Sequence, residues 1–87
     1  MALQKEYETS SGITANYHKI GKINYEKESG AYFEVEIYLN ESARRDNKKP
    51  LETRTFYSEN INVDEPLVTQ LYNYLKTLPE YEGAQDA

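Results

Sequence analysis

The sequence predicts an α+β fold: an antiparallel sheet of three or four strands with one C-terminal helix packed on one face. Two observations lead to this prediction. Apolar and polar residues alternate along several segments before residue 60, which is the period of half-buried strands. After residue 64, apolar residues recur every three to four positions, as they do in an amphipathic helix. Strands followed by a single helix favour an antiparallel sheet covered on one side.

The chain length of 87 residues favours one domain. We expect it to span residues 1–79, with residues 80–87 as an acidic, flexible tail. Leu, Ile, Val and Phe make up only 17 of the 87 residues, so the core is thin. Nine Tyr compensate, because each can bury its ring while its hydroxyl stays hydrogen-bonded. Such a fold is marginally stable alone, which favours oligomerisation.

The first two predicted strands cover residues 3–9 and 15–26. In the second, Ile20 and Ile23 would fall on opposite faces under strict alternation. A bulge at Gly21 would return Ile23 to the core side. Residues 27–30 then form a turn.

The clearest strand signal is residues 31–39, predicted to be a central strand paired antiparallel with its predecessor. Its odd positions form an apolar face: Ala31, Phe33, Val35, Ile37 and Leu39. Its even positions form a second face of Tyr32, Glu34, Glu36 and Tyr38. One helix cannot cover both faces of a sheet, so the even positions are expected to be exposed to water or to another subunit.

Residues 41–50 are polar and too many for a tight hairpin, which predicts a protruding loop. Residues 51–58 are rich in Thr and aromatic residues and read as a strand. Phe56 breaks its alternation, as expected where both faces of an edge strand are partly used.

The final helix begins at residues 64–66. Asp64 can cap the free amides, and Pro66 is tolerated in the first turn. An apolar stripe follows, formed by Leu67, Leu71, Leu75 and Leu78 with Val68 and Tyr72. Lys76 lies in the last turn, and Pro79 ends the helix. We expect this helix to cover the apolar face of residues 31–39.

No enzymatic site is expected, and no cofactor or metal site. The sequence has no Cys, which excludes disulfides and thiolate chemistry. His18 is the only His, lacks a triad arrangement, and reads as a strand-surface residue. The four Gly are scattered singly, so a Gly-rich phosphate loop is absent. Residues 1–12 contain no apolar run of the kind found in a signal peptide, which favours a soluble, cytoplasmic product.

Two groups of residues are candidates for protein binding. The first is the Tyr and Glu stripe of Tyr32, Glu34, Glu36 and Tyr38, a composition typical of protein-recognition surfaces. Its two Glu could alternatively form a carboxylate pair or a cation site. The second is the basic segment with Arg44, Arg45, Lys48 and Lys49, which would suit an acidic protein surface better than nucleic acid, because four cations are few.

The charge is unevenly distributed along the chain. The net charge is −5, yet residues 1–58 carry nine Lys or Arg and nine Asp or Glu, while residues 59–87 carry one Lys and six acids. One hypothesis is that the tail acids Glu80, Glu82 and Asp86 bind the basic segment of an identical subunit.

Most of the chain resembles small proteins encoded among the structural genes of long-tailed bacteriophages and prophages of Gram-positive bacteria. The resemblance lies in the Met-Ala-Leu start, ANYHKI at residues 15–20, PLETRTF at 50–56 and LYNYLKTLPEYEGA at 71–84. It implies a non-enzymatic role in the virion or in tail assembly, and it carries over no catalytic residues.

The expected partners are other phage structural proteins or further copies of the chain, in a homo-oligomer. No small-molecule substrate, nucleic acid or membrane is expected as a partner. The protein would then occur in the virion, or in the host cytoplasm during assembly. The alternative is a monomeric intracellular regulator or inhibitor that binds a host or phage protein.

Overall fold

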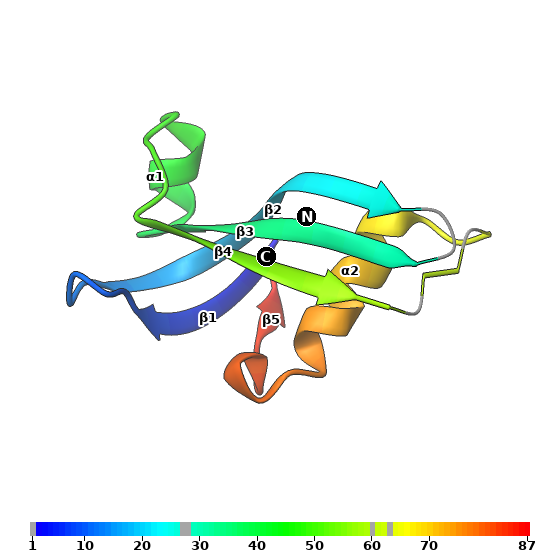
Figure 1. The fold of residues 1–87 in the computed structure, drawn as a ribbon. Coiled ribbons are helices and arrows are strands. Elements are labelled where there is room, and N and C mark those ends of the chain that lie inside the picture. Colours follow the sequence, from blue (N-terminus) through cyan, green and yellow to red (C-terminus); the bar gives the residue numbers. More distant parts are fainter. Residues whose placement is uncertain (1, 27–28, 60, 63) are drawn as a thin grey trace.

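The computed structural model describes residues 2–26, 29–59, 61–62 and 64–87. A five-stranded antiparallel sheet with the strand order β4-β3-β2-β1-β5 is covered on one face by the helix α2 (Figure 1). The elements, in chain order, are β1 (Leu3–Glu8), β2 (Thr14–Glu26), β3 (Gly30–Tyr38), α1 (Glu41–Arg45), β4 (Glu52–Ser58), α2 (Leu67–Lys76), the 3₁₀-helix η1 (Pro79–Tyr81) and β5 (Gln85–Asp86).

The predicted α+β class, the antiparallel sheet and the C-terminal helix are confirmed, but the sheet has five strands and not three or four. Each of β1 to β4 pairs with the strand that precedes or follows it, so β3 is interior and β4 lies at an edge, as predicted. The turn predicted at residues 27–30 lies partly outside the described residues, because 27 and 28 are not among them.

The irregularity predicted at Gly21 is present. Ile20 is paired with Val35 and Ile23 with Phe33, so β2 uses one more residue than β3 between these pairs. The bulge keeps both Ile side chains on the core side. A Cβ on Gly21 would lie 2.7 Å from Cδ of Glu36, so a larger residue there would require the Glu36 carboxylate to move.

The core lies between α2 and the odd-numbered positions of β3, as expected. Its buried residues include Phe33, Val35 and Ile37 from β3 together with Leu71, Tyr72 and Leu75 from α2. The Tyr72 hydroxyl accepts a 2.9 Å hydrogen bond from the Ile20 amide, which satisfies a buried polar group.

Leu39 was expected in this core, and that expectation is wrong. It is 46% exposed, because β3 ends at Tyr38 and the chain turns at once into α1. Asn40 caps α1 by accepting a 2.9 Å hydrogen bond from the Ala43 amide. The predicted loop at residues 41–50 therefore begins with a short helix.

The start of α2 also differs from the prediction. Pro66, not Asp64, occupies the N-cap, and no side chain caps the helix there. The Gln70 side chain fixes the segment that leads into α2 instead. Its Oε1 accepts a hydrogen bond from the Asn62 amide at 2.7 Å, and its Nε2 donates one to the Asn62 carbonyl at 2.6 Å. Val68, predicted in the apolar stripe, is 43% exposed.

Residues 80–87, expected as a flexible tail, extend the fold. The ring of Tyr81 in η1 is fully buried in the core cluster. β5 pairs with β1 through Leu3 with Asp86 and Gln4 with Gln85. In the described part of the chain, no helix has the length and apolar character needed to cross a membrane.

Candidate functional site

The sheet face turned away from α2, here called the second sheet face, carries the predicted Tyr and Glu stripe. Strand alternation and cross-strand register bring the following side chains to it: Tyr17, Lys19, Lys22 and Asn24 from β2, Tyr32, Glu34, Glu36 and Tyr38 from β3, and Thr53, Thr55 and Tyr57 from β4. This face therefore carries both charge signs as well as aromatic rings.

Tyr32 is an exposed aromatic residue at one end of the second sheet face. Its side chain is 48% exposed. The ring of Tyr57, which stands opposite it in the register, lies 4.6 Å away between ring centroids at an interplanar angle of 47°. The Tyr57 hydroxyl donates a 2.9 Å hydrogen bond to the Ser29 carbonyl. The pair is thus held in place before any partner binds.

A hollow of about 300 Å³ lies beside Tyr32 on the second sheet face. The side chains or backbone of Lys22, Asn24, Glu34 and Thr55 line it together with Tyr32 and Phe33. A ring held next to a hollow that combines apolar surface with the polar groups of Lys22 and Glu34 can take an amphipathic side chain of another protein.

Tyr38 was expected to be exposed, and the structure shows that it is buried, with only 6% of its surface accessible. Its ring packs edge-on against Tyr17 at 6.4 Å, and its hydroxyl donates to Glu36 at 3.0 Å. Burial raises the pKa of Tyr38, and the Glu36 carboxylate raises it further, although the nearby Arg44 acts in the opposite direction. Tyr38 and Glu36 therefore belong to a packed end of the face.

The structure gives no support for a cation site at Glu34 and Glu36. Glu36 is engaged by Tyr38, and Lys19 stands opposite it in the register. Over the described ranges, no cluster of three or more His, Cys, Asp or Glu side chains is placed to hold a metal ion.

The four predicted basic residues lie on α1 and on the loop that follows it. Arg45 pairs with Glu41 at 2.7 Å on the same helix. Arg44 lies near the Tyr38 hydroxyl, so the structure brings one basic residue next to the stripe. Lys48 and Lys49 are exposed, and neither makes an ion pair with any described residue.

The acidic C-terminal segment is paired within the chain. Arg54 donates to Glu80 at 2.6 Å, and Lys76 pairs with Asp86 at 2.7 Å. The Glu82 carbonyl accepts from Lys5. Two of the three acids proposed as partners for another subunit are therefore occupied in the folded monomer.

His18 was expected on the strand surface, and that expectation is also wrong, because its side chain is only 1% exposed. Nδ1 lies 2.9 Å from the Tyr81 hydroxyl, and Nε2 lies 2.8 Å from the Lys5 carbonyl. Burial lowers the pKa of His18. Both ring nitrogens are occupied, so His18 serves to join β2, β1 and η1.

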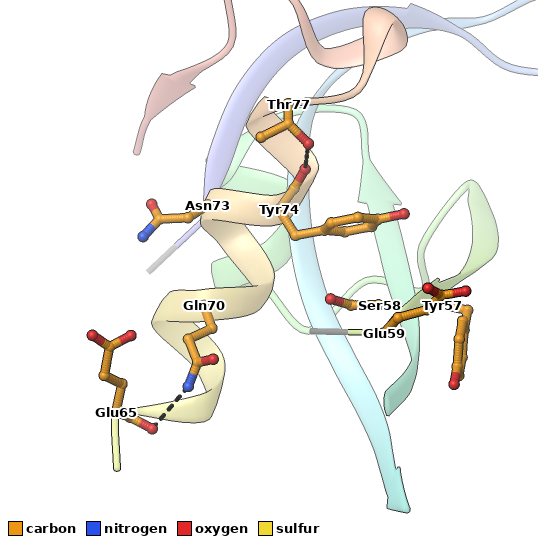
Figure 2. A pocket seen from close by; sticks show the side chains of 8 residues that line it. All are labelled: Tyr57, Ser58, Glu59, Glu65, Gln70, Asn73, Tyr74 and Thr77. Atoms are coloured by element: carbon orange, nitrogen blue, oxygen red, sulfur yellow. Dashed lines mark hydrogen bonds between the residues drawn. The ribbon is translucent and has the colours of Figure 1, made fainter. Parts of the chain in front are cut away.

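Sequence reasoning missed a groove between β4 and α2, here called the β4–α2 groove (Figure 2). It encloses about 480 Å³ and is lined by Tyr57, Ser58, Glu59, Glu65, Gln70, Asn73, Tyr74 and Thr77. Figure 2 shows the Tyr74 ring pointing from α2 towards Ser58 and Glu59. Periodicity could not reveal this groove, because its two walls are separate elements.

The groove and the second sheet face share Tyr57. Partial burial raises the pKa of the Tyr57 hydroxyl, and the neighbouring Tyr32, Glu59 and Glu26 raise it further. The aromatic pair therefore stands at an acidic end of the molecule.

No family model matches the chain, and neither a curated protein nor a solved structure is significantly similar to it.

Proposed function

We propose that the chain is a non-enzymatic assembly protein of a phage virion or tail, which acts through contacts with other phage structural proteins and with copies of itself. The exposed Tyr32 beside Tyr57 is the single observation that carries this proposal. The resemblance of the sequence to proteins encoded among phage structural genes supplies the biological setting.

The chemistry of the second sheet face supports a protein partner. Tyr rings offer a large contact area at a small cost in side-chain entropy, and they are enriched at the centres of interfaces. Lys22 and Glu34 beside the hollow offer one charge of each sign. A surface of mixed sign does not build the dense positive potential that binding to nucleic acid requires.

The proposal is tested by measuring the mass of the purified protein by light scattering at micromolar concentrations. We expect an oligomer whose dissociation constant rises on the order of tenfold in Tyr32→Ala, because a central aromatic residue is a typical hot spot. Val68→Ala is the matched control: Val68 is 43% exposed, yet it lies on α2 away from the second sheet face.

The alternative role, that of a monomeric regulator, predicts no self-association. A strict monomer at all concentrations, with Tyr32→Ala indistinguishable from wild type in every binding assay, would favour a monomeric regulator and would remove the assembly role. An oligomer that is insensitive to Tyr32→Ala would keep self-association and move it to another surface.

A further inference from the structure

We infer that the β4–α2 groove binds the basic loop of residues 46–49 of a second copy of the chain, so that copies join head to tail. This inference rests on the proposed self-association, and it adds a charge contact beside Tyr32, which packs on Tyr57 at the edge of the groove. Unpaired charges of opposite sign lie at the two ends of one molecule.

The groove supplies acidic groups that the fold leaves unused. Glu59 and Glu65 are exposed on opposite walls, and within the described residues neither carboxylate has an ion-pair or hydrogen-bond partner (Figure 2). Glu80 and Asp86, in contrast, are paired with cations of their own chain. The groove, and not the C-terminal segment, therefore holds the acids available to a partner.

The basic loop supplies the complementary groups in a fixed shape. Lys48 and Lys49 are exposed, and no described residue pairs with either ammonium group. Asn47 adopts a left-handed conformation with φ of 58°, and the Lys48 amide donates to the Ala43 carbonyl at 3.1 Å. The loop is held against α1 by this turn, so little ordering is needed when it binds.

The groove walls suit an aliphatic chain that ends in a cation. The Tyr74 ring can pack along a Lys stem, and the carboxylates of Glu59 and Glu65 can receive its ammonium group. β4 is also an edge strand, and an edge strand directs backbone N–H and C=O groups away from its one neighbour. An incoming loop can hydrogen-bond to that edge.

The positions of the two surfaces determine the kind of assembly. α1 stands at one end of the sheet, while the end of β4 and the start of α2 lie at the other, in a molecule 37 Å long (Figure 1). The loop of one copy therefore meets the groove of the next. A contact between two different surfaces generates a closed ring or an open filament rather than a two-fold dimer.

Sedimentation velocity of full-length variants tests the inference. The loop variant carries Lys48→Glu and Lys49→Glu, and the groove variant carries Glu59→Lys and Glu65→Lys. All four side chains are exposed, so both variants should fold. Each should raise the dissociation constant of self-association on the order of tenfold or more, because like charges then face each other. Salt at about 0.5 M should weaken the wild-type assembly by screening the same charges.

The decisive sample is an equimolar mixture of the two variants. The loop variant keeps an intact groove and the groove variant keeps an intact loop, so the mixture should regain assembly that neither variant shows alone. A control with Glu6→Lys and Glu8→Lys, two exposed acids on β1, makes the same change in net charge as the groove variant and should assemble as wild type does.

Each remaining outcome contradicts the inference. If the wild type assembles and both variants do so equally well, the groove and the loop are not the interface, while the proposed assembly function stands. If the variants are monomeric and their mixture stays monomeric, the loop and the groove do not bind each other. A wild type that is monomeric at every concentration would remove both the inference and the proposed self-association.

Discussion

His18 is the residue whose protonation state the fold determines most directly. A neutral imidazole has one N–H donor and one acceptor nitrogen. The Lys5 carbonyl can only accept, so Nε2 carries the hydrogen, and the Tyr81 hydroxyl donates to Nδ1. Protonation would place a second N–H against the Tyr81 hydroxyl and a charge in a buried site.

The stability of the fold should therefore decrease in mild acid. Burial lowers the pKa of His18 in the folded state below the unfolded value of about 6.5, so the unfolded chain takes up the proton first. This contribution is fully present above about pH 6.5. It is lost as the pH falls, with a slope of at most about 1.4 kcal/mol per pH unit from this one group. Urea unfolding measured between pH 7.5 and about 5.5 checks the direction.

The matched control for this pH effect is His18→Gln. His18 is the only His in the chain, so the variant should be less stable at neutral pH but should lose most of the slope in this range. A wild-type stability that rises on acidification over the same range would contradict the assignment of a neutral, buried His18.

Gly30 should be the least replaceable glycine. Its φ is +151°, and an added Cβ would lie 2.2 Å from the Ser58 carbonyl oxygen of the neighbouring strand β4. We expect Gly30→Ala to lower the free energy of unfolding by more than about 3 kcal/mol, because the strain of a disfavoured conformation and a backbone clash add. Gly12→Ala is the control: φ is +85° there, but nothing lies within 4 Å of the new Cβ, so only the conformational strain of about 1 kcal/mol should appear. Equal losses in the two variants would show that the backbone of β4 moves away at no cost.

Among the elements, the short C-terminal segment of residues 79–87 connects several parts of the fold. η1 places the Tyr81 ring in the core, 5.1 Å from the His18 ring and 6.2 Å from the Phe56 ring. β5 then adds a strand beside β1, and Glu80 pairs with Arg54 of β4. One short segment thus contacts three strands of the sheet.

Removal of residues 79–87 should consequently destabilise the monomer and not merely release a tail. Loss of a large buried aromatic side chain alone costs about 3–5 kcal/mol, which is a large part of the stability of a domain of this size. A shorter truncation that removes only residues 85–87 keeps Tyr81 and removes β5, so it should cost much less. Urea unfolding of both truncated proteins compares the two. Equal stability of wild type and the longer truncation would contradict the role assigned to Tyr81.

The elements predicted correctly are those with a strong periodic signal. The alternation in β3, the bulge at Gly21 and the apolar positions Leu71 and Leu75 of α2 were all evident in the sequence. β5 could not be predicted, because a strand of two residues shows no period. The burial of His18 and Tyr81 depends on a contact between residues 63 positions apart, which only the folded chain creates.

The candidate site was predictable to a similar extent. Alternation placed Tyr32 and Glu34 correctly on the second sheet face. Alternation gives the face of a residue but not what covers it, so the burial of Tyr38 next to Tyr17 was missed. The β4–α2 groove was missed because its walls come from the end of β4, the connection that holds Glu59 and Glu65, and one side of α2, which come together only after folding.

At the scale of the whole molecule, the thin core limits the stability of one copy, and the opposite charges at the two ends of the molecule favour binding of a second copy. On the α2-facing side of the sheet, Tyr7 and the Ser10 amide donate hydrogen bonds to Glu52 and so join β1 to β4. The Ser10 amide and the Tyr7 hydroxyl together lower the pKa of the Glu52 carboxyl. A fold with so little apolar burial gains stability when a second copy binds only its folded state.

The thermal midpoint Tm should therefore rise with protein concentration. Once the concentration exceeds the dissociation constant, each further tenfold increase adds up to about 1.4 kcal/mol to the folded state of each bound copy. For a domain of 60–100 residues, 1 kcal/mol corresponds to about 4–8 °C in Tm. A concentration series followed by circular dichroism should thus show a shift of several degrees for the wild type, whereas the loop variant with Lys48→Glu and Lys49→Glu should give a constant Tm. A constant wild-type Tm would mean that the isolated fold is stable without a second copy, and the coupling between assembly and stability would then be absent.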